Sequence, residues 1–171
     1  AGPNENQIGA EPGCGYRWHG RSHTIFSCLV AGGGDESISQ PCFSPDGRSL
    51  VYASDRAGWS QLWCRDLDAD TELRLTEERC DIATPAWIQG LRAFGFAPDG
   101  TLYFVRSERG GRRAYALGPD GGAVEPVESL AQYDHVEQIT PAPRGNHLAC
   151  IASSPAVPAR IVSGRANRAR V

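Results

Sequence analysis

The residues best suited to metal binding gather near the start of the chain, where Cys14, His19, His23 and Cys28 follow one another. Thiolate and imidazole groups are the usual ligands of structural zinc sites. Such sites generally present their ligands in close pairs on a tight turn, and this array contains no closely spaced pair of cysteines. We therefore expect ordinary strand or surface residues here, and we expect the chain to use no metal and no cofactor.

Two other groupings contain residue types that serve in hydrolysis. Asp134 precedes His135, and an adjacent carboxylate raises the pKa of a histidine toward the range needed for proton transfer. Neighbouring strand residues point to opposite faces, however, so we expect a loop or sheet-edge role for this pair. Ser60 follows Gly58 and Trp59, but no second glycine completes the Gly-x-Ser-x-Gly pattern of a nucleophile elbow. The sequence thus predicts no catalytic residue.

A third group of residues suits contact with a substrate or with a second domain. Asp55-Arg56 and Glu108-Arg109 occupy equivalent loops of a repeat described below, although exposed pairs of this kind usually contribute less than about 1 kcal/mol. Trp59 and Trp87 fall outside the strand pattern, and both can serve as rim contacts or simply pack. The candidate rim residues are Asp55, Arg56, Trp59, Trp87 and Arg92.

Composition limits the classes of partner. The 171 residues carry 17 basic and 20 acidic side chains, a net charge of −3, and the two signs are interspersed. No basic face for phosphate is evident, so we expect no nucleic-acid partner. No apolar run approaches the roughly 20 residues that cross a bilayer, so we expect no membrane partner. The chain begins with Ala1 and contains no Met, from which we expect it to be a part of a longer protein.

Six cysteines are present, an even number that three disulfides would use up in a secreted protein. Their spacing shows no tight framework, and four of them stand among apolar strand residues: Cys28, Cys42, Cys64 and Cys150. A free cysteine behaves as a small buried hydrophobe. We therefore favour reduced thiols over disulfides, and with them a cytoplasmic location.

The elements that must position these residues follow from an internal repeat. The turn Ser44-Pro45-Asp46-Gly47 returns as Ala97-Pro98-Asp99-Gly100 and, altered, as Ala142-Pro143-Arg144-Gly145. Proline presets the backbone for a tight turn and glycine supplies positive φ, so each tetrapeptide predicts a hairpin. Short β-branched or aromatic runs flank each turn and predict strands on both sides of it.

A further strand follows each hairpin at a constant distance, because Leu50 to Leu62, Leu102 to Ala114 and Leu148 to Arg160 all span 12 residues. Fourth strands are predicted at 72–76 and 123–127. Radially repeated four-stranded units of about 40–50 residues are typical of β-propeller blades. We therefore predict an all-β partial β-propeller of about three and a half four-stranded antiparallel blades. The expected divisions are a remnant of a preceding blade at 1–39, blades at 40–88 and 89–133, and a partial blade with an irregular tail at 134–171.

The string QPCFSPDGRSLVYASDR at 40–56, followed by GWSQLW at 58–63, resembles the propeller of the prolyl oligopeptidase family of serine peptidases. The likeness is strongest to its dipeptidyl aminopeptidase and acylaminoacyl peptidase branch, and it covers roughly residues 35–162. TolB-like propellers share the Pro-Asp-Gly turn. The segment Pro-Ala-Trp-x-x-Gly-x-Arg at 85–92 is what points to the peptidases.

This resemblance implies a parent protein that hydrolyses peptides or acyl-peptides by means of a C-terminal α/β-hydrolase domain absent from this chain. The chain would then be a non-catalytic propeller segment that gates the access of peptide substrates to that domain, and we expect it to be inactive alone. The alternative is a TolB-like or WD-like propeller that acts as a protein-binding scaffold. Continuation of the reading frame into a Gly-x-Ser-x-Gly domain or into more blades distinguishes the two.

Overall fold

A computed structural model describes residues 29–77, 79–83 and 90–165 of the chain. The described residues form eleven β-strands and one short 3-10 helix, η1 (Glu128–Leu130), which precedes the ninth strand. No helix among them is long and apolar enough to cross a membrane. The all-β class predicted from the turn repeats is therefore confirmed.

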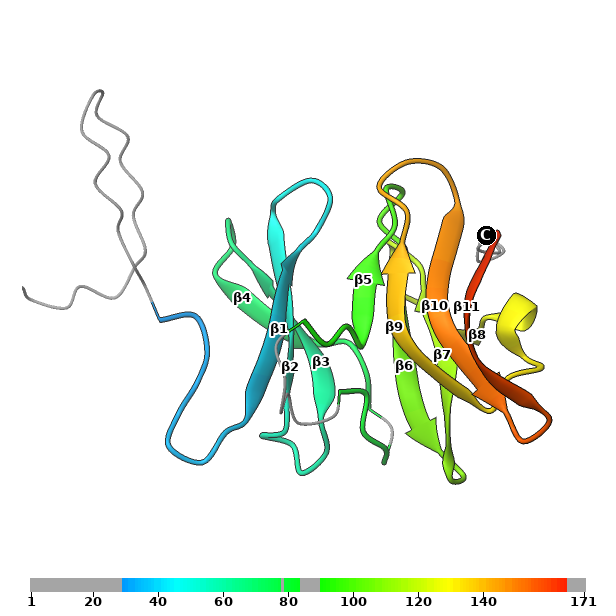
Figure 1. Cartoon of the computed structure of the whole chain (residues 1–171). Coiled ribbons are helices and arrows are strands. Elements are labelled where there is room, and N and C mark those ends of the chain that lie inside the picture. Colours follow the sequence, from blue (N-terminus) through cyan, green and yellow to red (C-terminus); the bar gives the residue numbers. More distant parts are fainter. Residues whose placement is uncertain (1–28, 78, 84–89, 166–171) are drawn as a thin grey trace, which may run out of the picture. The chain divides into compact units, whose positions relative to one another are not determined.

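The first blade is a four-stranded antiparallel sheet in sequential order (Figure 1). Its strands are β1 (Ile38–Phe43), β2 (Ser49–Ser54), β3 (Gln61–Asp66) and β4 (Thr71–Arg74). The predicted hairpin turn joins β1 to β2: the Gly47 N–H donates to the Ser44 carbonyl at 2.9 Å, and Gly47 has a φ of 73°. Glycine adopts this left-handed conformation without steric cost, which explains its place in the motif.

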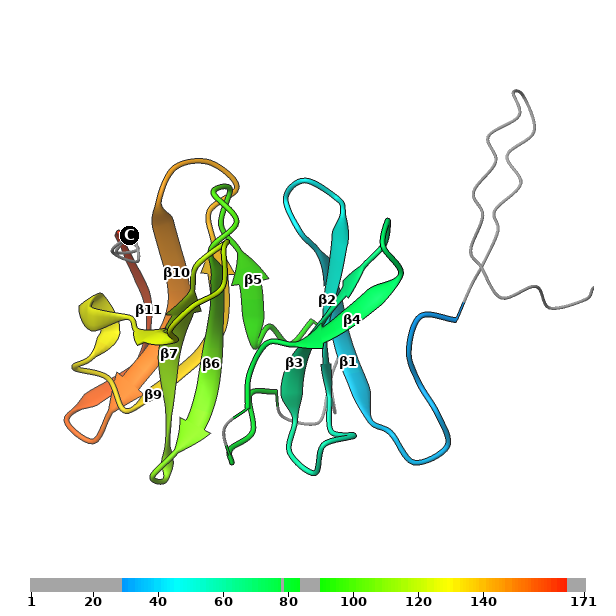
Figure 2. The same cartoon turned by 180° about the vertical axis from the view of Figure 1, so that it is seen from behind.

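The second and third blades form one continuous sheet (Figures 1 and 2). The second contains β5 (Phe94–Phe96), β6 (Leu102–Glu108), β7 (Gly111–Leu117) and β8 (Glu125–Pro126). The third contains β9 (His135–Pro141), β10 (His147–Ser154) and β11 (Val157–Arg165). A short parallel pairing between Arg112 of β7 and His135 of β9 joins the two blades.

Strand β6 separates two hydrophobic cores, because successive side chains of a strand point to opposite faces. Tyr103 and Val105 belong to the core shared with the third blade, whereas Leu102 and Phe104 belong to the core shared with the first. All four side chains are almost fully buried. This two-sided burial is what stacks one blade on the next.

The strands agree with the predicted repeat, and propellers match the structure as reported below, so the partial-propeller prediction is also confirmed. The fourth strands are shorter than expected. In the second blade β8 comprises only Glu125 and Pro126, and one further backbone bond to β7 follows, from the Val127 N–H to the Ala114 carbonyl at 3.0 Å. In the first blade β4 ends at Arg74, although the Leu75 N–H still donates to the Leu62 carbonyl at 2.8 Å and Thr76 Oγ1 accepts from the Leu62 N–H at 3.0 Å.

Three of the cysteines lie in strands as free thiols, namely Cys42, Cys64 and Cys150. Burial raises the pKa of each thiol above its ordinary value. Because the thiolate is the reactive form, these three side chains serve packing and have little reactivity. Cys14 and Cys28, with His19 and His23 of the array considered for zinc, lie outside the described residues.

Candidate functional site

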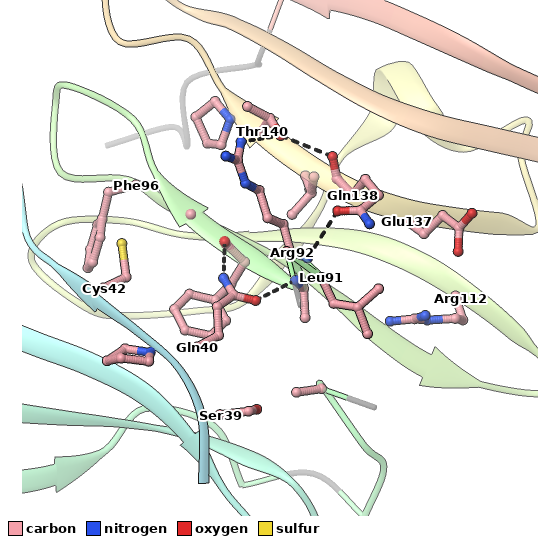
Figure 3. A pocket seen from close by; sticks show the side chains of 18 residues that line it. Ser39, Gln40, Cys42, Leu91, Arg92, Phe96, Arg112, Glu137, Gln138 and Thr140 are labelled. Carbon is pink, nitrogen blue, oxygen red and sulfur yellow. Dashed lines mark hydrogen bonds between the residues drawn. The ribbon is translucent and has the colours of Figure 1, made fainter. Parts of the chain in front are cut away.

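A cavity of about 620 Å³ runs along the first strands of all three blades (Figure 3). We call it the inner-strand cavity. Its walls come from β1, β5 and β9 and from the segment that leads into β5. The lining residues are 39–42, Ala83, 90–96, Arg112 and 137–141.

Two glutamines at equivalent places of the repeat shape the walls of the cavity. Gln40 and Gln138 have φ values of 52° and 56°, in the left-handed region that side-chain-bearing residues seldom enter. The register of β1 on β2 shifts between Ser39 and Cys42, and the register of β10 on β9 shifts between Ala149 and Ile151. Each glutamine therefore lies in a β-bulge, a feature that redirects a side chain out of the ladder.

Both side chains reach the segment that leads into β5. The Gln40 Nε2 group donates to the Phe94 carbonyl at 2.6 Å, and its Oε1 accepts from the Ala93 N–H at 2.7 Å. Gln138 Oε1 accepts from the Arg92 N–H at 3.1 Å. We call these contacts the glutamine clasp. They join neighbouring blades through amide side chains at the inner strands.

Arg92, one of the candidate rim residues, lies at the wall of the inner-strand cavity. Its backbone carbonyl accepts from the Ile139 N–H at 3.2 Å, which ties it to β9 a second time. Its guanidinium group donates to Thr140 Oγ1 at 3.4 Å (Figure 3). The side chain thus presents positive charge beside the clasp.

Arg112 is a second cation of the same cavity. Its N–H donates to the Asp134 carbonyl at 2.8 Å, so the start of β7 is fixed against the start of β9. Its Nε atom is buried and has no hydrogen-bond partner in the described part of the chain. Burial lowers the pKa of this guanidinium, and the nearby Glu137 carboxylate partly opposes the shift.

Arg56 has a different environment, inside the first blade. Its guanidinium lies 3.6 Å from the centre of the Trp63 ring and 2.7 Å from the Glu72 carboxylate, and it also donates to the Tyr52 hydroxyl. Tyr52 in turn donates to Glu72. Burial, with the Glu72 contact, raises the pKa of Tyr52 to about 12, so this hydroxyl stays protonated. The network joins β2, β3 and β4.

The other candidate rim residues lie apart from the cavity. The Asp55 carboxylate accepts from the Ser37 N–H at 2.8 Å and so holds the entry to β1. Trp59 is 44% exposed in the loop between β2 and β3. Trp87 lies outside the described residues. The structure therefore brings Asp55, Arg56 and Trp59 into one loop region and places Arg92 at the inner strands.

The residues weighed for catalysis are placed as parts of blade junctions. The Asp134 carboxylate accepts from Arg113 at 2.7 Å, across the junction of β7 and β9, and the His135 imidazole lies 3.8 Å from Glu137. The Ser60 N–H donates to the Asp81 carboxylate at 2.9 Å. These contacts link neighbouring segments of the fold, and Ser153 of β10 is the cross-strand neighbour of His135.

Sequence reasoning missed Gln40, Gln138 and Arg112. For the two glutamines a signal was present, because each stands five residues before the proline of its turn motif, Pro45 and Pro143. For Arg112 no signal distinguishes it from the other sixteen arginines. Its significance depends on the approach of β7 to β9, which only the fold shows.

Comparison with known proteins places this geometry in context. Neither a protein-family model nor a curated protein sequence matches the chain. Among solved structures, a puromycin-hydrolysing peptidase from Mycobacterium tuberculosis matches 82% of the chain and 21% of its own length, with 27% identity and a TM-score of 0.71. A puromycin hydrolase matches 80% of the chain and 20% of its own length, with 26% identity and a TM-score of 0.70.

A putative TolB from Agrobacterium tumefaciens is similar over 80% of the chain and 48% of its own length, at 21% identity and a TM-score of 0.60. At this identity the match supports the propeller fold alone. The chain spans about a fifth of the length of the peptidases that it matches. The expected resemblance of this chain to a propeller portion of prolyl oligopeptidase family peptidases is thereby confirmed.

Proposed function

We propose that this chain is a propeller segment of a serine peptidase that hydrolyses peptides or acyl-peptides, and that it gates the access of substrates to a C-terminal α/β-hydrolase domain of the same protein. The observation that carries the proposal is the match to puromycin-hydrolysing peptidases at 26–27% identity over four fifths of the chain. The blade divisions near residues 40, 89 and 134 belong to this proposal.

The inner-strand cavity supports a gating role. In a propeller the first strands of the blades surround the central channel. Here those strands enclose a cavity whose walls are joined by side-chain amides of the glutamine clasp rather than by a continuous backbone ladder. Net hydrogen bonds of this type contribute only about 1 kcal/mol each, so opening the glutamine clasp itself costs little, while the buried cores keep the blades stacked. A peptide chain can then pass where a folded protein cannot.

The first test concerns catalysis. The gene that encodes the chain should continue into a domain with a Gly-x-Ser-x-Gly motif, and the product of the whole gene should cleave aminoacyl or acyl-peptide chromogenic substrates. The 171-residue chain alone should show no turnover. A gene that continues into further blades only, or turnover by the isolated chain, would contradict the proposal.

The second test concerns gating, and it uses the whole gene product. The double variant Gln40→Ala, Gln138→Ala removes the clasp, so hydrolysis of a long peptide should rise relative to hydrolysis of a short chromogenic substrate. Arg48→Gln changes an exposed side chain in the turn before β2 and should leave this ratio unchanged. An unchanged ratio in the clasp variant would show that the inner strands do not gate.

The alternative function is a protein-binding scaffold without a hydrolase partner. The propeller match to TolB is compatible with it but carries the fold only. Such a protein would bind its partner without any change in a peptidase activity. We also propose a cytoplasmic location, supported by the free thiols of the half-buried Cys42 and Cys64 and of the buried Cys150.

A further inference from the structure

Arg112 places a permanent positive charge at the inner-strand cavity without using it in the fold. Its Nε atom is buried with no hydrogen-bond partner, and within the described residues the guanidinium forms no ion pair. Removing a charged group from water is costly unless another group compensates it. Buried polar groups in native proteins are nearly always hydrogen-bonded, so an unsatisfied one needs an explanation.

The position of Arg112 is set by backbone contacts and not by its charge. The preceding residue, Gly111, lies so close to β9 that a Cβ atom there would be 2.5 Å from the Asp134 carbonyl oxygen. Only glycine fits at this approach. The Arg112 N–H then donates to the same carbonyl at 2.8 Å. The junction therefore holds the start of the side chain firmly at the cavity.

The surroundings of Arg112 favour an anion. Figure 3 shows Arg112 and Glu137 at the same end of the cavity, with Arg92 and Thr140 at another. The lining thus contains two arginines and one carboxylate. Glu137 also lies 3.8 Å from His135, which places its charge between two basic groups. The excess of positive charge remains at the cavity wall.

We propose that Arg112 binds the carboxylate group of a peptide held in the inner-strand cavity. A guanidinium presents its donors as a planar fork that matches both oxygens of a carboxylate. Bound in this way, the carboxylate gives the guanidinium the ion pair that it does not form within the described residues. The choice of a peptide as ligand rests on the proposed function; the choice of a carboxylate rests on the unpaired guanidinium alone.

The carboxylate has two possible sources, the C-terminus of the peptide and an acidic side chain. Three acetylated tripeptides separate them: tri-alanine with a free C-terminus, its C-terminal amide, and the amide with a central glutamate. Acetylglycine is a fourth probe, a carboxylate without a peptide chain. Binding of each probe to the 171-residue chain is measured by isothermal titration calorimetry.

Wild type should bind free-acid tri-alanine at least about tenfold more tightly than the amide, because a hydrogen bond to a charged group contributes about 1.5–3 kcal/mol. Tight binding of the glutamate peptide would assign the site to acidic side chains, and weak binding would assign it to the C-terminus. Equal affinities for all three tripeptides, with no binding of acetylglycine, would overturn the proposal, and this comparison needs no variant.

Arg112→Gln should abolish the preference for the acid, whereas the control Arg48→Gln, with the same loss of charge at an exposed site, should retain it. A retained preference in Arg112→Gln would also overturn the proposal. Binding of acetylglycine without binding of any tripeptide would uphold the carboxylate site and count against the peptide function. The two proposals therefore fail in different ways.

Discussion

Two arginines of this propeller have opposite surroundings. Arg56 lies against Trp63 and Glu72 and is fully engaged in the first blade. Arg112 lies beside the inner-strand cavity with an unpaired, buried Nε atom. A cation whose donors are all used holds strands together. A cation that lines a cavity and forms no ion pair within the described residues is available to a ligand.

The second blade repeats the engaged arrangement with different residues. Arg106 lies 4.0 Å from the centre of the Tyr115 ring and 3.0 Å from Glu108, and Tyr115 donates to Glu108 at 2.6 Å. Tyr115 follows Trp63 by the same 52 residues that separate Leu50 from Leu102. A group of arginine, aromatic ring and glutamate is therefore a recurring internal brace of the blades, and Arg112 is not part of it.

The largest expected effect concerns the junction that positions Arg112. Gly111→Ala should lower the free energy of unfolding by about 3 kcal/mol, because the new Cβ atom meets backbone rather than a flexible side chain. It should also weaken binding of free-acid tri-alanine. Urea denaturation and calorimetry measure the two effects.

Gly34→Ala is the matched control for that substitution. No heavy atom lies within 4 Å of a Cβ at position 34, so stability and binding should both stay near wild type. If Gly111→Ala is as stable as wild type, the junction of β7 and β9 can relax. The claim that this junction fixes the position of Arg112 would then be wrong.

The next largest effect is on stability, where substitutions of Arg56 and Arg112 should change the free energy of unfolding differently. Arg56→Leu should lower the free energy of unfolding by about 2 kcal/mol, because it removes a cation–π contact with Trp63 and the ion pair with Glu72. Arg112→Leu should leave stability unchanged or raise it, since it removes a half-buried charge that forms no ion pair within the described residues. If urea denaturation shows that both variants lose the same free energy of unfolding, the proposed difference between Arg56 and Arg112 is wrong.

The glutamine clasp should show a smaller and graded effect. Gln40→Ala removes two hydrogen bonds and Gln138→Ala removes one, so losses of about 2 and about 1 kcal/mol are expected. Gln40→Gly should be less harmful than Gln40→Ala, because glycine relieves the strain of positive φ. If thermal unfolding shows that Gln40→Gly is less stable than Gln40→Ala, the backbone at this bulge is not strained.

The smallest effect is a pH dependence in the second blade. The Tyr115 hydroxyl, and after it Arg106, lowers the pKa of Glu108. Because the pKa of Glu108 is lower in the folded state, its ionised carboxylate stabilises the fold at neutral pH. This stabilisation is lost as pH falls from the ordinary glutamate value of about 4.3 through the lower folded value. Glu108→Gln should therefore show a smaller loss of stability between pH 7 and pH 3 than wild type.

Tyr115→Phe is the companion variant for this measurement. It removes the hydrogen bond that contributes most to the shift, so the acid-induced loss attributable to Glu108 should shrink. The expected difference is under about 1 kcal/mol, as is usual for partly exposed charged groups. Identical pH profiles of wild type and both variants would contradict this role of Glu108.

The sequence predicted the fold because local chemistry determines it. The Pro-Asp-Gly turns, the strand runs and the constant 12-residue spacing all depend on nearby residues, and β2, β3, β6, β7 and β10 lie where they indicate. The brief fourth strands were harder to predict, since they depend on how far a ladder extends past Pro126 or Arg74.

The site was only partly predictable, because it depends on contacts between distant segments. Arg92 was selected and does line the inner-strand cavity. Arg56 was selected as a rim contact, and the structure places it in a brace. Arg112 was not selected, because its unpaired state follows from the packing of β7 against β9. The residues next to Arg112 in the sequence give no sign of this packing.

One NMR titration tests the distinction between the two arginines most directly, by following the Nε–Hε resonances of Arg56 and Arg112 in the same sample. On addition of acetylated tri-alanine with a free C-terminus, the Arg112 resonance should shift in a saturable manner and the Arg56 resonance should stay in place. The C-terminal amide should move neither. A stationary Arg112 resonance, or an Arg56 resonance that titrates with the free acid, would contradict the account.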